Sequence, residues 1–219
     1  MRAQLFAGAL ALSSFSSAHA EQKPTPHLMG GVRTLTPFGY KGFCTAYPAG
    51  CPTTPAGPRH IAETPKVLKD LKDVNQRING KIRPLNDMSH WGTSDPRYLV
   101  KDADGNVVGV ERWSYAEDGK GDCEEYVILK RHFLLVMGYP RSVLLITVAH
   151  TDKGETHAVL IVRTDKQDLV LDNLRETIVP WHKTGYRFVQ QQDQVDTNVW
   201  VALVNEPQAV KTTAAIHKK

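Results

Sequence analysis

The sequence contains few cysteines, little net charge and no long apolar run beyond its first twenty residues. Its three cysteines include no Cys-x-x-Cys pair, which argues against a cysteine-bound metal. The formal net charge of +4 is small and dispersed, so it gives no indication of nucleic-acid binding. No stretch after residue 20 is long and apolar enough to span a membrane, and no internal repeat occurs. These absences favour one globular domain with or without an N-terminal extension.

Residues 1–20 have the pattern of a secretory signal peptide. Arg2 supplies a positive start, residues 5–12 are apolar, and Ala18-His19-Ala20 is a small-x-small cleavage site. The mature chain would then begin at Glu21, and the resulting prediction is an exported protein with no transmembrane segment in its mature chain. An N-terminal membrane anchor is the alternative, although the apolar stretch is short for one.

The rest of the chain divides into three predicted parts. Residues 21–60 have many turn-forming residues and few periodic apolar positions, so we expect an irregular N-terminal wrap. Residues 61–206 form the main domain, and 207–219 form a flexible polar tail. Within the wrap, Cys44 and Cys51 lie close in sequence, and a disulfide between them is expected in an oxidising compartment. A pairing of Cys123 with either of them is the competing possibility.

The order of the predicted elements indicates an α+β fold. A helix is expected from Thr64 to about Asn79, followed by a loop-like region over 80–100 and a second helix after Cys123. The remaining pattern predicts strands at 143–149, 157–163, 169–174, 188–189 and 198–204. Helices followed by an antiparallel meander are typical of this fold class.

The segment Gly121-Asp122-Cys123-Glu124-Glu125-Tyr126 indicates a nucleophilic cysteine at a helix N-terminus. Asp122 is a good N-cap residue, and Glu125 stands at the capping-box position. Cys123 is then the first residue of the helix, where the positive end of the helix dipole favours a thiolate. The alternative is that Cys123 is a small buried residue with no catalytic part.

Two further residues could complete a catalytic triad with this cysteine. His157 begins one predicted strand and Asp172 lies late in the next, so the hairpin would place them opposite or diagonally opposite each other. Cysteine, histidine and aspartate supply a nucleophile, a base and a group that orients the base. The alternatives are an ordinary surface or core histidine and a strand that ends in an Asp172-Asn173 turn.

These motifs together resemble the bacterial transglutaminase-like cysteine proteinases, the group that contains the LapG-type periplasmic proteases. The resemblance runs from about Val67 to Trp200. It is carried by Asn75-Gln76-Arg77-Ile78-Asn79, Trp113, Gly121-Asp122-Cys123-Glu124-Glu125-Tyr126, His157-Ala158-Val159-Leu160 and Leu169-Val170-Leu171-Asp172-Asn173-Leu174. It implies a Cys123–His157–Asp172 triad in a papain/transglutaminase-like fold, in which the nucleophile helix packs on an antiparallel sheet.

The resemblance also implies a calcium ion held by Asp122 and Glu124, with Glu125 as a further ligand. Members of the family usually have aspartate at the position of Glu125. An independent argument comes from charge, because three carboxylates beside Cys123 would raise the pKa of its thiol and a bound dication would offset that effect. The alternative is that Asp122 and Glu125 are only well-solvated helix caps.

The predicted function is that of an exported, calcium-dependent cysteine endopeptidase acting on a protein substrate. LapG-type members cut a large surface adhesin and are restrained by an inner-membrane receptor, so the resemblance also implies a role in biofilm release. Two alternatives use the same fold. One is an amidase or transglutaminase with the same triad, and the other is a non-catalytic, calcium-dependent periplasmic binding module.

Overall fold

The computed structural model describes residues 26–53 and 57–204, and a seven-stranded antiparallel sheet forms its centre. The predicted signal peptide (1–20) and the whole predicted tail (207–219) lie outside these residues. The strands in spatial order are β1 (Met29–Thr34), β11 (Trp200–Val204), β10 (Arg187–Gln192), β6 (Leu144–His150), β7 (Thr156–Arg163), β8 (Asp168–Leu171) and β9 (Val179–Pro180). The central strands β6 and β7 are almost fully buried, which explains why both read as continuous runs of apolar residues.

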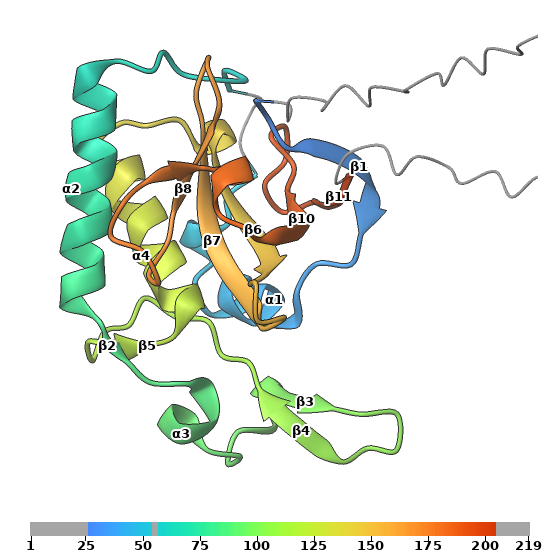
Figure 1. The fold of residues 1–219 in the computed structure, drawn as a ribbon. Helices are drawn as coiled ribbons and strands as arrows, with labels where there is room; N and C mark the ends of the chain where they lie inside the picture. The colour runs from blue at the N-terminus through green and yellow to red at the C-terminus, as the bar shows by residue number, and fades with distance from the viewer. Residues whose placement is uncertain (1–25, 54–56, 205–219) are drawn as a thin grey trace, which may run out of the picture.

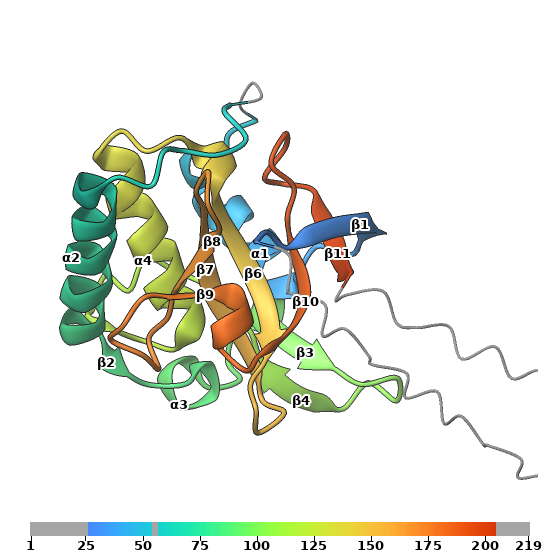
Figure 2. The same ribbon diagram turned by 45° about the horizontal axis from the view of Figure 1, so that its top comes forward.

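Three helices cover one face of the sheet (Figures 1 and 2). They are α1 (Phe38–Ala46), α2 (Pro65–Lys81) and α4 (Cys123–Val136). Helix α4 lies against β7, and α2 packs on α4. Leu71, Ile78 and Leu134 are fully buried between these layers. The predicted α+β class, with the nucleophile helix packed on an antiparallel sheet, is therefore confirmed.

The opposite face of the sheet carries a second, smaller core. Its buried members are Leu28, Leu145, Ala149, Val159, Ile161, Val170, Phe188 and Leu203. Trp181 and Tyr186 pack against it from the segment that contains the short 3-10 helix η4 (Trp181–Lys183) and the start of β10. This segment therefore covers the sheet where α1, α2 and α4 do not.

The region 80–100 contains more structure than the predicted loop. Strand β2 (Arg83–Pro84) pairs in parallel with β5 (Lys120–Gly121), and α3 (Asp87–Trp91) follows. Further along, η2 (Pro96–Tyr98) leads into β3 (Leu99–Lys101), which forms a projecting hairpin with β4 (Val107–Val110) (Figure 1). Because only Asp122 separates β5 from α4, the β2–β5 pairing brings α3 to the N-terminus of that helix.

The N-terminal segment also differs from the predicted irregular wrap. Residues 29–34 pair with β11 at the edge of the sheet, and residues 38–46 form α1. Tyr40 and Phe43 lie one helical turn apart and are both buried, so this short helix is held by tertiary packing. Irregular structure remains between these elements and after α1.

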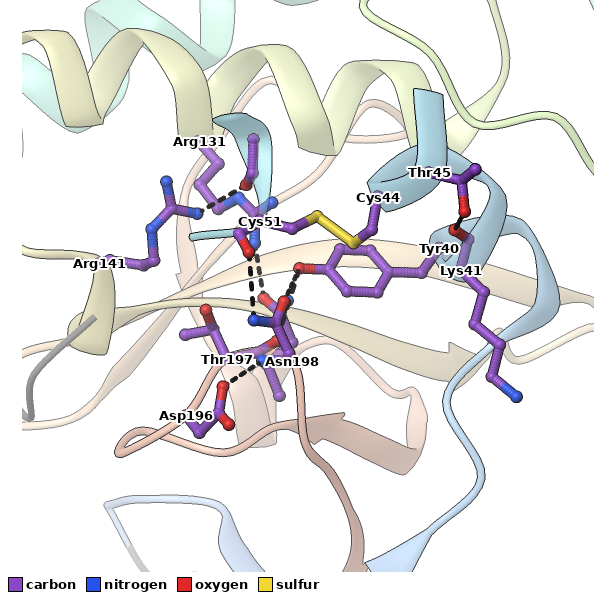
Figure 3. Close-up of a disulfide and its surroundings, with 12 residues drawn as sticks. Tyr40, Lys41, Cys44, Thr45, Cys51, Arg131, Arg141, Asp196, Thr197 and Asn198 are labelled. Carbon is purple, nitrogen blue, oxygen red and sulfur yellow. Dashed lines mark hydrogen bonds between the residues drawn. A yellow bond between two sulfur atoms is a disulfide. The ribbon is translucent and has the colours of Figure 1, made fainter. Parts of the chain in front are cut away.

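A disulfide joins Cys44 at the end of α1 to Cys51 (Figure 3). The loop around it is also tied to the domain, because Asn198 donates a hydrogen bond to the Cys51 carbonyl (3.2 Å) and Arg141 donates one to the Gly50 carbonyl (3.0 Å). The expected pairing thus forms, and Cys123 remains a free thiol. No helix among the described residues is long and apolar enough to cross a membrane.

Candidate active site

Cys123 is the first residue of α4, and its thiol lies in an acidic environment. The Glu125 carboxylate accepts a hydrogen bond from the Asp122 backbone N–H (3.0 Å), which marks the start of the helix as the capping-box spacing predicts. The Cys123 thiol donates a hydrogen bond to Glu124 Oε2 (3.1 Å). Burial, followed by the charges of Glu124 and Asp122, raises the pKa of Cys123 well above its ordinary value, while the Ala158 N–H of β7 acts in the opposite direction.

His157 and Asp172 form a close, buried pair. His157 Nε2 lies 2.8 Å from Asp172 Oδ1, and both side chains are almost completely inaccessible to solvent. The β7–β8 register places Leu160 opposite Leu171, so Asp172 is the diagonal neighbour of His157. Since the carboxylate occupies Nε2, Nδ1 is the ring nitrogen that remains for the thiol.

The Asp172 carboxylate has several hydrogen-bond donors besides His157. Oδ1 also accepts from the Leu174 N–H (2.9 Å), and Oδ2 accepts from the Tyr186 hydroxyl (2.8 Å). Although burial acts to raise it, the hydrogen bonds from His157, Leu174 and Tyr186 hold the pKa of Asp172 below its ordinary value. The carboxylate is therefore ionised over the whole physiological range.

The loop that follows Asp172 is anchored from α2. Asn79 donates hydrogen bonds from Nδ2 to the Asp172 carbonyl (2.9 Å) and to the Arg175 carbonyl (3.3 Å). Asn75 does the same to the carbonyls of Arg175 (3.1 Å) and Glu176 (3.2 Å). These two asparagines belong to the segment 75–79 that the sequence singled out, and the structure gives both of them a role in placing Asp172.

A cavity of about 440 Å³ brings the nucleophile and the base together. Cys123 and His157 both contribute to its wall, on either side of the junction between α4 and β7. Apolar and polar groups from several loops form the rest of the lining, among them Leu85, Thr151, Glu155 and Leu174. The cavity therefore exposes the thiol to a ligand next to a histidine that is already oriented by a carboxylate.

A cluster of carboxylates surrounds the N-terminus of α4. One group with ligand atoms within 4.8 Å of one another consists of Asp122, Cys123 and Glu124, and a second consists of Asp87, Asp122 and Glu125. Asp122 belongs to both groups, whereas Glu124 belongs only to the first and Glu125 only to the second. Asp87 comes from α3 and is brought here by the β2–β5 pairing.

The charge of this cluster is poorly compensated. Burial, followed by the charges of Asp122 and Glu111, raises the pKa of Asp87 to about 7. Burial and neighbouring carboxylates also raise the pKa values of Glu124 and Glu125 well above the ordinary value. Asp87 Oδ1 and Asp122 Oδ1 are buried and have no hydrogen-bond partner among the described residues. Orphaned carboxylate oxygens in a buried acidic cluster are what a hard cation such as calcium would coordinate.

The family described as bacterial transglutaminase-like cysteine proteinase matches residues 30–107 and 100–208. The chain belongs to this family. Its enzyme class is therefore that of a cysteine peptidase. No curated protein matches the chain.

The solved structures that match include several of Legionella pneumophila LapG. One is 28% identical over 60% of this chain and 66% of the LapG chain, just under two thirds of its length, with a TM-score of 0.44. The calcium-bound form is 23% identical over 77% of this chain and 82% of its own, with a TM-score of 0.47. The EGTA-treated form is 26% identical over 64% and 69% of the two chains, with a TM-score of 0.45.

All six predicted site residues of this cysteine proteinase lie in one region. Cys123 and His157 share a cavity, and Asp172 holds His157. Asp122 and Glu124 lie next to the thiol, whereas Glu125 joins Asp122 and Asp87 in the second acidic group. Sequence reasoning missed Asp87 and Tyr186. Neither has a local signal, because the β2–β5 pairing places Asp87 and the packing of the loop before β10 places Tyr186.

Proposed function

We propose that the chain is a cysteine endopeptidase that uses Cys123, His157 and Asp172 as its catalytic triad. The observation that carries this proposal is the buried His157–Asp172 pair, with its 2.8 Å hydrogen bond, beside a cavity that also holds the helix-terminal thiol of Cys123. A free cysteine whose thiol lies at a helix N-terminus, next to an oriented imidazole, fits nucleophilic attack on a peptide carbonyl.

In this mechanism His157 Nδ1 takes the proton of the Cys123 thiol as the sulfur attacks the scissile carbonyl. Asp172 keeps the other ring nitrogen protonated and stabilises the imidazolium. The Cys123 backbone N–H, at the first position of α4, is available to the oxyanion. The imidazolium then protonates the leaving amine, and His157 activates a water that hydrolyses the thioester.

We also propose that the acidic cluster binds calcium through Asp122, Glu124 and Glu125, with Asp87 as an additional ligand. A bound dication would supply positive charge at the point where uncompensated carboxylates now raise the pKa of the thiol. It would also compete with the thiol for the Glu124 carboxylate, which accepts the hydrogen bond of the Cys123 thiol. Both effects favour transfer of that proton to His157.

The cellular setting completes the proposal. The N-terminal pattern of the sequence supports export to the periplasm. A large surface adhesin as the substrate and an inner-membrane receptor as a partner rest on the family resemblance, with biofilm release as the consequence. The second candidate function is another acyl transfer on the same triad, by an amidase or transglutaminase, because a cysteine–histidine–aspartate site serves both hydrolysis and amine transfer.

The experiment that tests this function follows Cys123 and a peptide pool together. We expect iodoacetamide to alkylate Cys123 at lower pH with calcium than with EGTA, and His157→Ala to lose most of this reactivity. The wild type should also cleave peptides in a proteome-derived library, whereas Cys123→Ala should cleave none. An unreactive thiol and an uncleaved library would leave the binding-module alternative, and amine incorporation without cleavage would indicate the transglutaminase.

A further inference from the structure

Both oxygens of Asp172 are engaged, and they have different partners. Oδ1 serves His157 and the Leu174 N–H, whereas Oδ2 accepts the Tyr186 hydroxyl at 2.8 Å. Tyr186 is not adjacent to Asp172 in the chain. It lies between η4 and β10, on the segment that covers the second face of the sheet.

The ring of Tyr186 also contacts the catalytic histidine. The two rings are edge to face, with centroids 5.8 Å apart and an interplanar angle of 87°. Tyr186 thus touches both members of the His157–Asp172 pair, one through its ring and the other through its hydroxyl.

Tyr186 is itself held in place by its neighbours. The Arg175 guanidinium carbon lies 5.2 Å from the centroid of the Tyr186 ring, and Arg175 Nη2 donates a hydrogen bond to the Thr184 carbonyl (2.6 Å). The Tyr186 N–H donates to Thr184 Oγ1 (3.1 Å). These contacts join the loop after Asp172 to the loop before β10 and limit the rotamers of Tyr186.

From these contacts we propose that Tyr186 is a positioning residue of the peptidase, an inference that rests on the proposed function. Its hydroxyl fixes the rotation of the Asp172 carboxylate so that Oδ1 stays on His157 Nε2. Its ring limits rotation of the imidazole. The bond that Asp172 makes to the base then needs no reorganisation when the thiol proton arrives.

The pH dependence of this arrangement is set by the groups that face Asp172. They are His157 from β7, Tyr186 from the loop before β10, Lys130 from α4, and Arg175, whose Nε lies 3.8 Å from Oδ2. The α2 neighbour, Asn79, is neutral. Hydrogen bonds to the Asp172 carboxylate are stronger when it is ionised, so loss of the Tyr186 hydroxyl makes protonation of Asp172 easier.

The test compares Tyr186→Phe, Tyr186→Leu and the control Tyr139→Phe in the full chain. Tyr139 follows the far end of α4 and donates its hydroxyl to Asp70 on α2 at 2.7 Å, so its change to phenylalanine removes the same type of bond away from the site. The first measurement is kcat/KM against pH for a peptide cleaved in the library experiment, with saturating calcium. The second is the nuclear magnetic resonance titration of the His157 imidazole in a Cys123→Ala background.

We expect Tyr186→Phe to lower kcat/KM about tenfold, the factor that corresponds to one lost hydrogen bond to a charged group. Its acidic limb should move to higher pH, and the His157 titration should change. Tyr186→Leu should lose more activity, because the ring contact with His157 is also removed. Tyr139→Phe should match the wild type in both measurements.

A Tyr186→Phe variant with the wild-type acidic limb and His157 titration would overturn the proposal, even if its overall rate were lower. A uniform loss at every pH would reflect only a structural role. If the wild type cleaves no peptide, the peptidase function fails, whereas the His157 titration still decides the role of Tyr186.

Discussion

The two sides of the candidate active site differ in how well their charges are compensated. On the side of the base, Asp172 accepts hydrogen bonds at both oxygens, and its pKa lies below the ordinary value. On the side of the nucleophile, Asp87 Oδ1 and Asp122 Oδ1 have no partner among the described residues, and the pKa of Cys123 is raised. The two sides meet at the cavity between α4 and β7.

The difference shows which part of the site is held in place by the protein's own residues, without a bound cation. The His157–Asp172 pair needs no further group, since Leu174, Tyr186 and Asn79 already hold it in place. The cluster around Cys123 carries buried negative charge that opposes formation of a thiolate. A cation bound there would offset this charge and favour the Cys123 thiolate. Binding of the cation could then regulate the activity of the enzyme.

The largest expected loss of activity comes from a change on the side of the base, in the His157–Asp172 pair. Asp172→Asn should lower kcat/KM by about 10⁴-fold, because an amide favours the wrong histidine tautomer. Calcium should not restore the activity, since the defect lies on the other side of the site. Peptide cleavage measured with and without calcium checks this, with Asp152→Asn in the exposed β6–β7 turn as the control. Calcium rescue of Asp172→Asn would show that the two sides are not independent.

A smaller effect should follow from removing one charge on the other side. The pKa of Asp87, about 7, lies above its ordinary value of 3.8, so the folded state keeps a proton that the unfolded state releases. The stability contributed by Asp87 therefore falls as the pH rises from about 4 to about 7. Asp87→Asn should raise the melting temperature in EGTA, most of all above pH 7 and little near pH 4.

The same Asp87→Asn variant should respond less to calcium. A ligand at 100 times its Kd stabilises a protein by about 2.7 kcal/mol, and loss of one carboxylate should reduce this gain. Thermal melts with calcium and with EGTA measure both effects. Asp73→Asn, on the exposed face of α2, is the matched control and should behave like the wild type. An unchanged calcium response in Asp87→Asn would remove Asp87 from the ligand set.

The smallest effect concerns Lys130, a buried cation beneath the site. Its Nζ has no hydrogen-bond partner among the described residues, and burial lowers its pKa from 10.5 to about 7. Because the unfolded state binds this proton more tightly, the wild type gains stability as the pH rises from about 7 to about 10. Lys130→Met should stabilise the protein by about 2 kcal/mol at pH 6.

This gain should shrink towards pH 10, where the lysine is neutral in the folded wild type. Urea unfolding at both pH values measures it, and Lys72→Met on the exposed face of α2 serves as the control. Destabilisation by Lys130→Met at pH 6 would mean that the Lys130 ammonium stabilises the fold. Its favourable interaction would then be with the charge of Asp172, which raises the pKa of Lys130.

Elements that depend on local interactions could be predicted from the sequence, whereas elements that depend on tertiary contacts could not. The N-terminal end of α4 was predictable because the cap at Asp122 and Glu125 acts within one helical turn. Strands β6, β7 and β8 were predictable from buried apolar runs separated by clear turns. In contrast, β1 and α1 were predicted as irregular, because β1 depends on pairing with β11, more than 160 residues away, and α1 depends on tertiary burial of Tyr40 and Phe43.

The sequence by itself determined the nucleophile helix, the strand hairpin behind His157 and Asp172, and the acidic segment around Cys123. Capping, periodicity and hairpin register are local, so they can be read along the chain. Only the tertiary structure decided that Asp87 joins the acidic cluster and that Tyr186 binds the free oxygen of Asp172. The β2–β5 pairing places Asp87, and the packing of the loop before β10 places Tyr186. Neither kind of contact leaves a periodic trace in the sequence.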